Sequence, residues 1–451
     1  MKRIVIVAAK RTPFGRFRGA LAAISPVELA VIAGNSALVL GQSCFDGSGG
    51  RGWTERSEGS PGVSGWRPPT PATHQSIPDR ALVGIDRTLI DQVILGNVLA
   101  AGHGMNVARQ VAIRLGLPVE TPASTVNMMC GSGMQSALMA VSAIRAGEAN
   151  AVLVGGTESM SRSSLLMARP AKGQQPDAAT AVDSMQRDGL VDSFSNRHMG
   201  EQAEELAKDF HLSRETQDAF AARSQHLFGA ALARGDFADE VVCTGKLTAD
   251  QHPRPDVTTA ELALLQPVFQ KPESNGTVTA GNASGINDGA AVLLLAEQEF
   301  AESNGWPILA EWIDGVVVGC DPARMGLGPV HAIRTLMQRT KRDWANIDTL
   351  EINEAFAAQA LACLMALDLT LDVPAEQTFA KTVDGHRIEF NREGGAIAIG
   401  HPLAASGARL LTHLAWNIAH GKSRSAIGAL CIGGGMGIAA LLTVPQVGLR
   451  S

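Results

Sequence analysis

The side chain best placed for chemistry in this sequence is the thiol of Cys130, which stands directly before a Gly-Ser-Gly turn. Apolar residues then recur three and four positions apart, which predicts a helix that ends at Gly147 and is followed by a buried strand at 151–154. Unpaired N–H groups and the helix dipole favour an anion at a helix N-terminus and lower the pKa of a thiol there. We therefore predict that Cys130 is a nucleophile, although a lone cysteine is more often a small buried apolar residue.

Asn353, His401 and Cys431 are the other residues whose surroundings suggest chemistry. Asn353 stands where a predicted strand leads into a helix, a place where α/β sheets present functional groups, but an Asn here is also an ordinary helix cap. Pro402 favours an extended backbone at His401 and Gly400 permits close approach, which suits either a base acting on a thiol or a satisfied core histidine. Cys431 ends an apolar strand before three glycines, whose N–H groups suit an oxyanion; a buried strand thiol is the alternative.

Two similar runs of elements position these residues. Cys130 is followed by a helix, a buried strand and a pair of glycines. His401 is followed by a small-residue helix at 404–418, a strand at 427–432 and the three glycines. The repetition predicts an α/β protein with two similar halves. We expect two parallel-type sheets packed through shared helices, with a reactive group from each half meeting at the seam.

Length and composition limit the class of protein. A chain of 451 residues suggests two or three domains, and 45% apolar with 18% charged residues is typical of an α/β protein with a large core. The net charge of −6 argues against a nucleic-acid partner, and no apolar stretch reaches the roughly 18 residues that span a membrane. The six cysteines have no zinc-site spacing and suggest no disulfide framework, so we expect reduced thiols, no metal and a cytoplasmic location.

Two segments differ in composition from the rest of the chain. Residues 41–80, which follow a helix predicted at 26–40, are rich in Gly, Ser and Pro and contain only two of Val, Ile or Leu. Such a segment buries too little apolar surface to offset its ordering, which predicts a loop or disordered insert. Residues 161–280 are more polar, with helices predicted at 199–211 and 213–234, and we expect them to cover the site.

Seven segments resemble thiolase motifs and occur in thiolase order. They are NMMCGSG, GGTESMS, HMGEQAE, GTVTAGNASGINDGAA, NEAFAAQA, GGAIAIGHP and CIGGGMG, and they span nearly the whole chain. The resemblance implies the thiolase fold, an α/β fold with a duplicated αβαβα five-layered core and an inserted loop domain. It also implies an acyl transferase that performs a reversible Claisen condensation on coenzyme A thioesters, most like the members that form acetoacetyl-CoA from two acetyl-CoA.

The resemblance also implies catalytic roles. Cys130 corresponds to the acylated nucleophile and His401 to the base that deprotonates it. Cys431 corresponds to the second acid/base, which exchanges a proton with the α-carbon of acetyl-CoA. One oxyanion hole would consist of His401 with a water held by Asn353, and the other of the backbone N–H groups of Cys130 and Gly433. No permanently bound cofactor and no metal is expected.

Further resemblance concerns the binding of coenzyme A. His198 and Met199 correspond to residues that line the pantetheine tunnel, Ser284 to a pantetheine contact, and Arg254 to a residue near the adenine and phosphates. One departure from the family pattern bears on this binding: Gln266 stands where an arginine is common, which weakens the usual basic patch.

A second departure is Ala404, which stands where a glycine is usual, and its methyl group is tolerable if the backbone φ there is negative. A third is an apparent expansion of the chain near residues 373–392.

The implied organisation has three parts. Residues 1–160, closed by a strand within 287–306, would form the first thiolase half. Residues 161–286 would form the loop domain and 307–451 the second half. Acetyl-CoA and 3-ketoacyl-CoA would be the substrates, and the protein would be a homodimer or homotetramer.

Two other functions stay open. A degradative 3-ketoacyl-CoA thiolase of fatty-acid β-oxidation would use the same catalytic residues on longer chains. A non-catalytic acyl-CoA or lipid carrier on this fold would be expected to lose a cysteine or His401, and this chain keeps all of them. Condensing synthases of the same superfamily commonly use one cysteine with two histidines, which Cys431 argues against.

Overall fold

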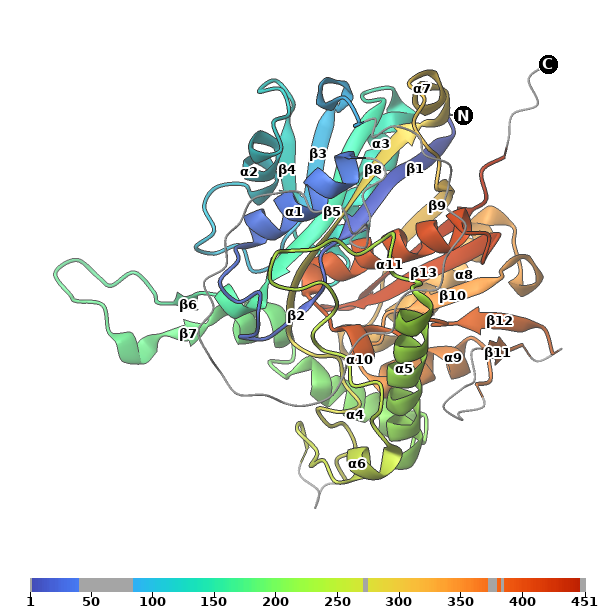
Figure 1. Cartoon of the computed structure of the whole chain (residues 1–451). Coiled ribbons are helices and arrows are strands. Elements are labelled where there is room, and N and C mark those ends of the chain that lie inside the picture. The colour runs from blue at the N-terminus through green and yellow to red at the C-terminus, as the bar shows by residue number, and fades with distance from the viewer. Residues whose placement is uncertain (1, 40–83, 271–274, 372–378, 383–384, 447–451) are drawn as a thin grey trace.

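The computed structural model describes residues 2–39, 84–270, 275–371, 379–382 and 385–446, and Figure 1 shows the whole chain. The predicted insert at 41–80 lies outside the described residues. Within the described ranges, no helix combines the length and the apolar character needed to cross a membrane.

The strands and helices alternate through most of the chain (Figure 1). The strands are β1 (Ile4–Arg11), β2 (Gly15–Arg16), β3 (Gln92–Gly96), β4 (Ala123–Val126), β5 (Ala151–Ser159), β6 (Leu165–Leu166), β7 (Val182–Asp183), β8 (Asn287–Glu297), β9 (Ala310–Gly319), β10 (Thr349–Ile352), β11 (Phe379–Lys381), β12 (Arg387–Phe390), β13 (Ser425–Ile432) and β14 (Met436–Thr443). The α-helices are α1 (Pro26–Leu38), α2 (Val107–Arg114), α3 (Ser132–Ala146), α4 (Met199–Asp209), α5 (Arg214–Arg234), α6 (Thr259–Ala263), α7 (Gln298–Ser303), α8 (Gly328–Thr340), α9 (Ala357–Ala366), α10 (Ala396–Ile399) and α11 (Leu403–Ala419). A 3₁₀ segment, η6, covers Pro322–Leu327.

Local sequence explains the ends of the helices that matter for the site. Ser25 caps α1, where its side chain accepts from the backbone N–H of Glu28 and Pro26 takes the first helical position. Helix α3 ends at Gly147, whose φ of 80° suits a residue without a side chain. The helix predicted after Cys130 is therefore confirmed.

The large sheet has the order β11-β12-β10-β13-β14-β9-β1-β8-β5-β3-β4, with β2 paired to β8. Read from its edge, the first half runs β4-β3-β5-β8-β1 and the second β12-β10-β13-β14-β9, so each strand has a counterpart in the other half. Helix α3 follows β4 and helix α11 comes after β12. The repeat inferred from the sequence is confirmed, and Cys130 and His401 occupy corresponding connections.

The expectation of two parallel-type sheets is wrong in two respects. The halves join into one 12-stranded sheet, because residues 4–6 of β1 pair antiparallel with residues 310–312 of β9. Each half is also mixed, since β8 runs antiparallel to β5 and β14 antiparallel to β13. The connection between β13 and β14 spans only residues 433–435, and so short a connection can join only antiparallel strands.

Helices cover the sheet in layers, which agrees with the expected αβαβα order. Helices α1 and α2 pack on one face of the first half, and α8 and α9 pack on one face of the second. Helices α3 and α11 share a core with strands of both halves and lie between them (Figure 1). Gly133 of α3 lies against the backbone of Ala404 and Ala408, so small residues let the two helices approach closely.

The segment between β5 and β8 contains α4, α5 and α6 and lies beside the second half (Figure 1). The pair of short strands β6 and β7 extends away from the main body in the same figure. The helices predicted at 199–211 and 213–234 are confirmed as α4 and α5. The expansion inferred near 373–392 contains β12, the counterpart of β4, so part of it belongs to the repeated core.

A buried group of charged side chains fastens this segment to the core. We call it the ionic cluster: Arg11, Glu240, Asp250, His413 and Glu393. Arg11 Nε lies 2.7 Å from Glu240 Oε1, and its two Nη atoms lie 2.7 and 2.9 Å from the carboxylate of Asp250. His413 bridges Glu240 at 2.8 Å and Glu393 at 3.2 Å. The cluster therefore joins the end of β1, the α4–α6 segment and α11.

Candidate active site

Cys130 lies in a tight turn between β4 and α3. The side chain of Ser132 holds the turn: its Oγ accepts from Met128 N–H at 2.8 Å and donates to the carbonyl of Met129 at 2.6 Å. Met129 has a φ of 47°, a left-handed conformation that costs a residue with a side chain on the order of 1 kcal/mol. This local strain directly before Cys130 is typical of functional turns.

Cys130 and Cys431 come from opposite halves and meet where the start of α3 approaches the end of β13. Gly131 packs against the side chain of Ile432, and a Cβ at this glycine would collide with it. The backbone N–H of Gly433 donates toward the sulfur of Cys130. The two thiols are close enough that the charge of Cys130 would raise the pKa of Cys431. Both cysteines therefore belong to one site.

The thiol of Cys130 is protonated in the free protein. Burial raises its pKa to about 11, although the N–H groups of Gly433 and of Cys130 itself lower it. The low pKa predicted from the helix N-terminus is therefore wrong for the free protein, because the loss of hydration outweighs the N–H groups and the helix dipole. A base must remove this proton before the sulfur can attack.

His401 lies in the turn between α10 and α11 and is held at both its backbone and its ring. Its N–H donates to Asn287 Oδ1 at 3.1 Å, and its Nδ1 lies 2.5 Å from Ser406 Oγ. The Ser406 hydroxyl donates to the carbonyl of Pro402 at 3.0 Å, so its oxygen accepts from Nδ1–H. The lone pair is then on Nε2, a buried atom with no hydrogen-bond partner in the described chain.

His401 is a neutral proton acceptor near pH 7. Burial, and to a smaller extent the charge of Arg409, lower its pKa to about 4. A buried neutral imidazole and a buried neutral thiol can exchange a proton to give an ion pair. Because the two charges attract at low dielectric, the pair is formed more easily than either ion alone.

Asn353 follows β10 and is buried beside His401. Its side-chain Nδ2 lies 3.4 Å from His401 Nδ1, and its Oδ1 has no hydrogen-bond partner in the described chain. The cap position of α9 belongs to Phe356, so Asn353 is not the helix cap that the sequence also allowed. Its free oxygen lies in the same buried site as the free nitrogen of His401.

Cys431 lies at the end of β13 among apolar side chains. It packs with Met199, Met325 and Ala355, and with the partly buried Phe356. Burial raises its pKa well above that of an ordinary thiol, and the neighbouring cysteines raise it further. Cys431 is therefore also a thiol at rest, able to donate a proton, and able to accept one only after it has lost its own.

The residues expected to bind coenzyme A lie along the α4–α6 segment and the approach to β8. Met199 packs near Cys431 and against Gly433. His198 caps α4, where its Nδ1 accepts from Gly200 N–H at 3.0 Å, and burial lowers its pKa. Its ring stacks on Phe269 with the centroids 4.6 Å apart.

Ser284 and Arg254 lie further out. Ser284 is half-buried and its N–H donates to the carbonyl of Ala355 at 3.0 Å. Arg254 is exposed, and its backbone N–H donates to Gln225 Oε1 at 2.7 Å. Met199 therefore lies near the thiol of Cys431, whereas Arg254 lies at the surface.

Three supporting residues were missed by the sequence reasoning. Asn287 and Ser406 hold His401, as described above, and both occur within or next to motifs that the sequence shows. The third, Glu158, is fully buried and accepts from the N–H groups of Val98, Leu99 and Ala404 at 3.0–3.2 Å. Burial raises its pKa to about 7. A glutamate inside an apolar strand pattern was the available signal.

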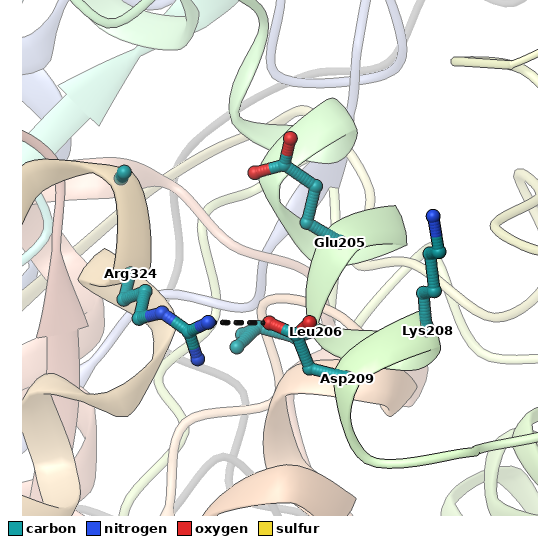
Figure 2. Close-up of a pocket in the computed structure, with 6 residues that line it drawn as sticks. Glu205, Leu206, Lys208, Asp209 and Arg324 are labelled. Atoms are coloured by element: carbon teal, nitrogen blue, oxygen red, sulfur yellow. Dashed lines mark ion pairs between the residues drawn. The ribbon is translucent and has the colours of Figure 1, made fainter.

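Two other features of the described chain resemble binding sites. Glu351, Glu393 and His413 are spaced as metal ligands, but both ring nitrogens of His413 already bond to carboxylates. A surface pocket of about 340 Å³ lies between α4 and η6 (Figure 2), where Arg324 reaches Asp209 at 2.9 Å. This ion pair fastens η6 to α4, which carry Met325 and Met199 toward Cys431. We therefore assign this ion pair a structural role, in which it holds the segments that carry Met199 and Met325.

Comparison with known proteins places the chain among thiolases. Residues 78–299 match the family described as "Thiolase, N-terminal domain", and residues 306–444 match "Thiolase, C-terminal domain". A probable acetyl-CoA acetyltransferase of Escherichia coli is 39% identical over 447 residues, 97% of this chain and 98% of the relative. An acetyl-CoA acetyltransferase of Pseudomonas aeruginosa is 38% identical over 453 residues, 98% of this chain and 99% of the relative.

Two solved structures are similar over nearly their whole length. Human mitochondrial 3-ketoacyl-CoA thiolase in complex with CoA is 34% identical with a TM-score of 0.80, covering 99% of this chain and 98% of that one. Bacillus anthracis acetyl-CoA acetyltransferase is 32% identical with a TM-score of 0.80, covering 99% of each chain.

Proposed function

Because the chain belongs to the thiolase family and is an acyltransferase, we propose that it condenses two acetyl-CoA to acetoacetyl-CoA and CoA, and catalyses the reverse thiolysis. The observation that carries the proposal is the meeting of two protonated thiols, Cys130 and Cys431, where Cys130 shares an apolar group with Leu403 and Ala404. These two residues follow the turn of His401, whose Nε2 has no hydrogen-bond partner among the described residues. Such a set suits acyl transfer through sulfur followed by proton transfer at carbon.

In the first half-reaction, His401 Nε2 takes the proton of Cys130 and the thiolate attacks the carbonyl carbon of acetyl-CoA. The bond from that carbon to the CoA sulfur breaks, and the departing thiolate takes the proton back from His401. The charge that builds on the carbonyl oxygen needs fixed donors. The N–H groups of Cys130 and Gly433, which already point at the sulfur, are suited to this role.

In the second half-reaction, the neutral His401 takes the proton of Cys431, and the resulting thiolate removes a proton from the methyl group of a second acetyl-CoA. The carbanion attacks the acetyl carbon on Cys130, a carbon–carbon bond forms, and the bond to the Cys130 sulfur breaks. The departing Cys130 thiolate takes the proton back from His401. We assign stabilisation of the enolate oxygen to Asn353 and His401, directly or through a water held by the Oδ1 of Asn353. Their side chains lie side by side, with Asn353 Nδ2 3.4 Å from His401 Nδ1, which supports this assignment. Thiolysis follows the same steps in reverse.

The walls around Cys431 support a short acyl chain. Met199 and Met325 both pack beside this cysteine, with Phe356 next to them. Large side chains at the reacting sulfur leave less room for a long acyl group than small ones would. The alternative, a 3-ketoacyl-CoA thiolase for longer chains, is favoured by the similarity to the human mitochondrial enzyme.

Thiolysis rates on 3-ketoacyl-CoA substrates of increasing length discriminate between these functions. We expect kcat/KM to be about 10³-fold higher for the four-carbon substrate than for the eight-carbon one, since each of the additional methylenes pressed against a full pocket costs on the order of 1 kcal/mol. Met325→Ala should narrow this ratio without abolishing activity. A wild-type enzyme that prefers eight carbons would contradict the acetoacetyl assignment and support the degradative alternative.

The division of labour between the thiols is tested with radiolabelled acetyl-CoA. Cys130→Ala should take up no label and show no turnover. Cys431→Ala should be labelled on Cys130 but condense at least about 10³-fold more slowly, because acylation does not need the second thiol. A Cys431→Ala variant with near-normal condensation would refute the role proposed for this residue.

The assembly and compartment are also proposed. Family resemblance suggests a homodimer or homotetramer acting on acetyl-CoA in fatty-acid metabolism, and the cysteine pattern suggests the cytoplasm. Light scattering on the purified protein gives the number of subunits, and cell fractionation gives the compartment. A monomer that is fully active would contradict the proposed assembly.

A further inference from the structure

The carboxylate of Glu158 joins the two halves of the protein close to the reactive residues. Glu158 lies on β5 of the first half and is fully buried. Its Oε1 accepts from Asn97 Nδ2 and from Leu99 N–H, both at 3.0 Å. Its Oε2 accepts from Val98 N–H at 3.1 Å and from Ala404 N–H at 3.2 Å. Because Ala404 belongs to α11 in the second half, one carboxylate binds backbone from both halves.

The loop after β3, which this carboxylate holds, also surrounds the nucleophile. Val98 and Leu99 belong to the same apolar group as Cys130. Directly before the loop, a Cβ at Gly96 would lie 2.7 Å from the Cβ of Ser132, the residue that holds the turn of Cys130. The carboxylate therefore fixes a segment that packs both beside the thiol and against its turn.

The first half holds Ala404 at its carbonyl as well as at its N–H. A Cβ at Gly156 would collide with the carbonyl of Ala404, and a Cβ at Gly133 would collide with the same oxygen. Ala404 follows His401 by three residues and lies in the first turn of α11. The start of the helix that comes directly after the reactive histidine is thus fixed by residues of the other half.

Hydrogen bonds alone offset the charge of Glu158, which makes no ion pair within the part of the chain that the structure describes. Burial raises its pKa to about 7, whereas the N–H groups of Leu99, Val98 and Ala404 favour the ionised form. Hydrogen bonds to a charged acceptor are about twice as strong as those between neutral groups. A neutral amide has only one accepting oxygen, so it would hold the two halves less firmly.

We propose that Glu158 is a positioning residue for acyl transfer, whose carboxylate holds the turn of His401 in place relative to the thiol of Cys130. The inference rests on the proposed function, because the step concerned is the transfer of an acyl group to Cys130. A base acts on a thiol only within hydrogen-bond reach, and here base and thiol belong to different halves. A displacement of about 1 Å between reacting groups lowers a rate by about 100-fold.

The first test measures acylation of Cys130 by labelled acetyl-CoA in Glu158→Gln, where an NH₂ group faces N–H groups that the carboxylate accepted from. We expect the maximal rate to fall about 10- to 100-fold with an unchanged half-saturating concentration, because the base is displaced and the thioester site is not. Glu204→Gln is the matched control. Glu204 is also a buried carboxylate, and it accepts from the N–H groups of Thr277 and Val278 at 2.9 Å. Its maximal rate should stay close to that of wild type.

The second test is alkylation of Cys130 by iodoacetamide near pH 7, which needs no thioester. Glu158→Gln should slow alkylation about 10-fold when His401 is present, because the base is less well placed. In a His401→Gln background the same change should not slow alkylation but raise its rate. The reason is that burial, and to a smaller extent the charge of Glu158, raise the pKa of Cys130. A change that only loosened the structure would act alike in both backgrounds.

Equal slowing of alkylation in both backgrounds overturns the proposal, and so does an acylation rate that falls as far in Glu204→Gln as in Glu158→Gln. If Glu158→Gln does not fold, Asn97→Ala takes its place, since it removes one donor to Oε1. Its acylation should be about 3- to 10-fold slower than that of wild type, and an unchanged rate overturns the proposal. If acetyl-CoA does not acylate the wild type, the proposed function fails, and the alkylation rates alone decide this inference.

Discussion

His401 and His413 are both buried and lie twelve positions apart, but near pH 7 the first is neutral and the second is protonated. Burial and the charge of Arg409 lower the pKa of His401 to about 4, and no carboxylate among the described residues raises it. Burial also acts to lower the pKa of His413, but the charges and hydrogen bonds of Glu240 and Glu393 raise it to about 10. Burial alone keeps a histidine neutral, so it is the presence of carboxylate partners that turns a buried base into a structural cation.

The surroundings of His401 and of His413 differ in how many polar atoms lack a hydrogen-bond or ionic partner. In the reactive site the thiols of Cys130 and Cys431, the Nε2 of His401 and the Oδ1 of Asn353 have free capacity. In the ionic cluster each nitrogen of His413 meets a carboxylate. A site that must bind and react keeps polar atoms available, whereas a site that holds three parts of the fold together uses them up.

The largest effect on activity is expected from His401→Gln. Removal of the base should lower kcat/KM for thiolysis by about 10³-fold, because Cys130 cannot ionise unaided. The melting temperature should stay within a few degrees of wild type, since the lost contacts are few. Steady-state assays check the expected loss of activity, and a thermal melt checks the expected stability. A melting temperature that falls as far as in His413→Gln would remove the distinction between the two histidines.

The largest effect on stability is expected from His413→Gln. Loss of the imidazolium leaves Glu240 and Glu393 less well paired, and breaking a buried ion pair costs about 3–5 kcal/mol. Urea denaturation measures this loss, and the folded variant should keep most of its thiolase activity. Arg339→Gln, which removes the exposed partner of Asp314, is the control and should cost no more than about 1 kcal/mol. An equal loss in both variants would contradict the role of the ionic cluster.

The ionic cluster should also shape stability against pH. The pKa of His413 rises from 6.5 to about 10, so its contribution is complete below about pH 6.5 and is lost as the pH rises toward 10. Despite its burial, the pKa of Glu240 falls from 4.5 to about 2, mainly through the charges of Arg11 and His413. Its contribution is complete above about pH 4.5 and is lost as the pH falls toward 2.

Urea denaturation across this pH range checks the cluster. Wild type should lose stability on both sides of the interval from about pH 4.5 to 6.5, which is bounded by the unperturbed pKa values of the two groups. His413→Gln should lose the decline on the alkaline side. If the variant shows the same alkaline decline as wild type, another group is responsible.

The smallest effect is expected from Ser406→Ala, which acts only through His401. Loss of one hydrogen bond to Nδ1 should lower kcat by about 3- to 10-fold, because the ring is less well oriented and the Nε2 lone pair less well fixed. The acid limb of the pH–rate profile should shift, whereas the melting temperature should barely change. A loss of stability without a shift of the profile would make Ser406 a packing residue only.

Much of the fold and of the candidate site follows from the sequence. The helix after Cys130 has apolar spacing and a terminal glycine, and the repeat shows in the order of elements around His401. These patterns are local, so they can be recognised in the sequence without knowing which strands pair with one another. The mixed character of the sheet was missed, because strand direction depends on connections and on pairing that are not local.

The sequence by itself determined which groups are able to react: two cysteines, a histidine in a glycine–proline turn and an asparagine at a strand end. Only the tertiary structure decided whether these groups are protonated and which residues lie next to them. It brought Cys130 beside Gly433 across the seam between the halves, and it buried the thiol so that its pKa rises to about 11, opposite to the shift expected from the helix N-terminus. The physical reason is that hydration and the positions of other charges depend on what packs around a group, and the residues that pack there come from distant parts of the chain.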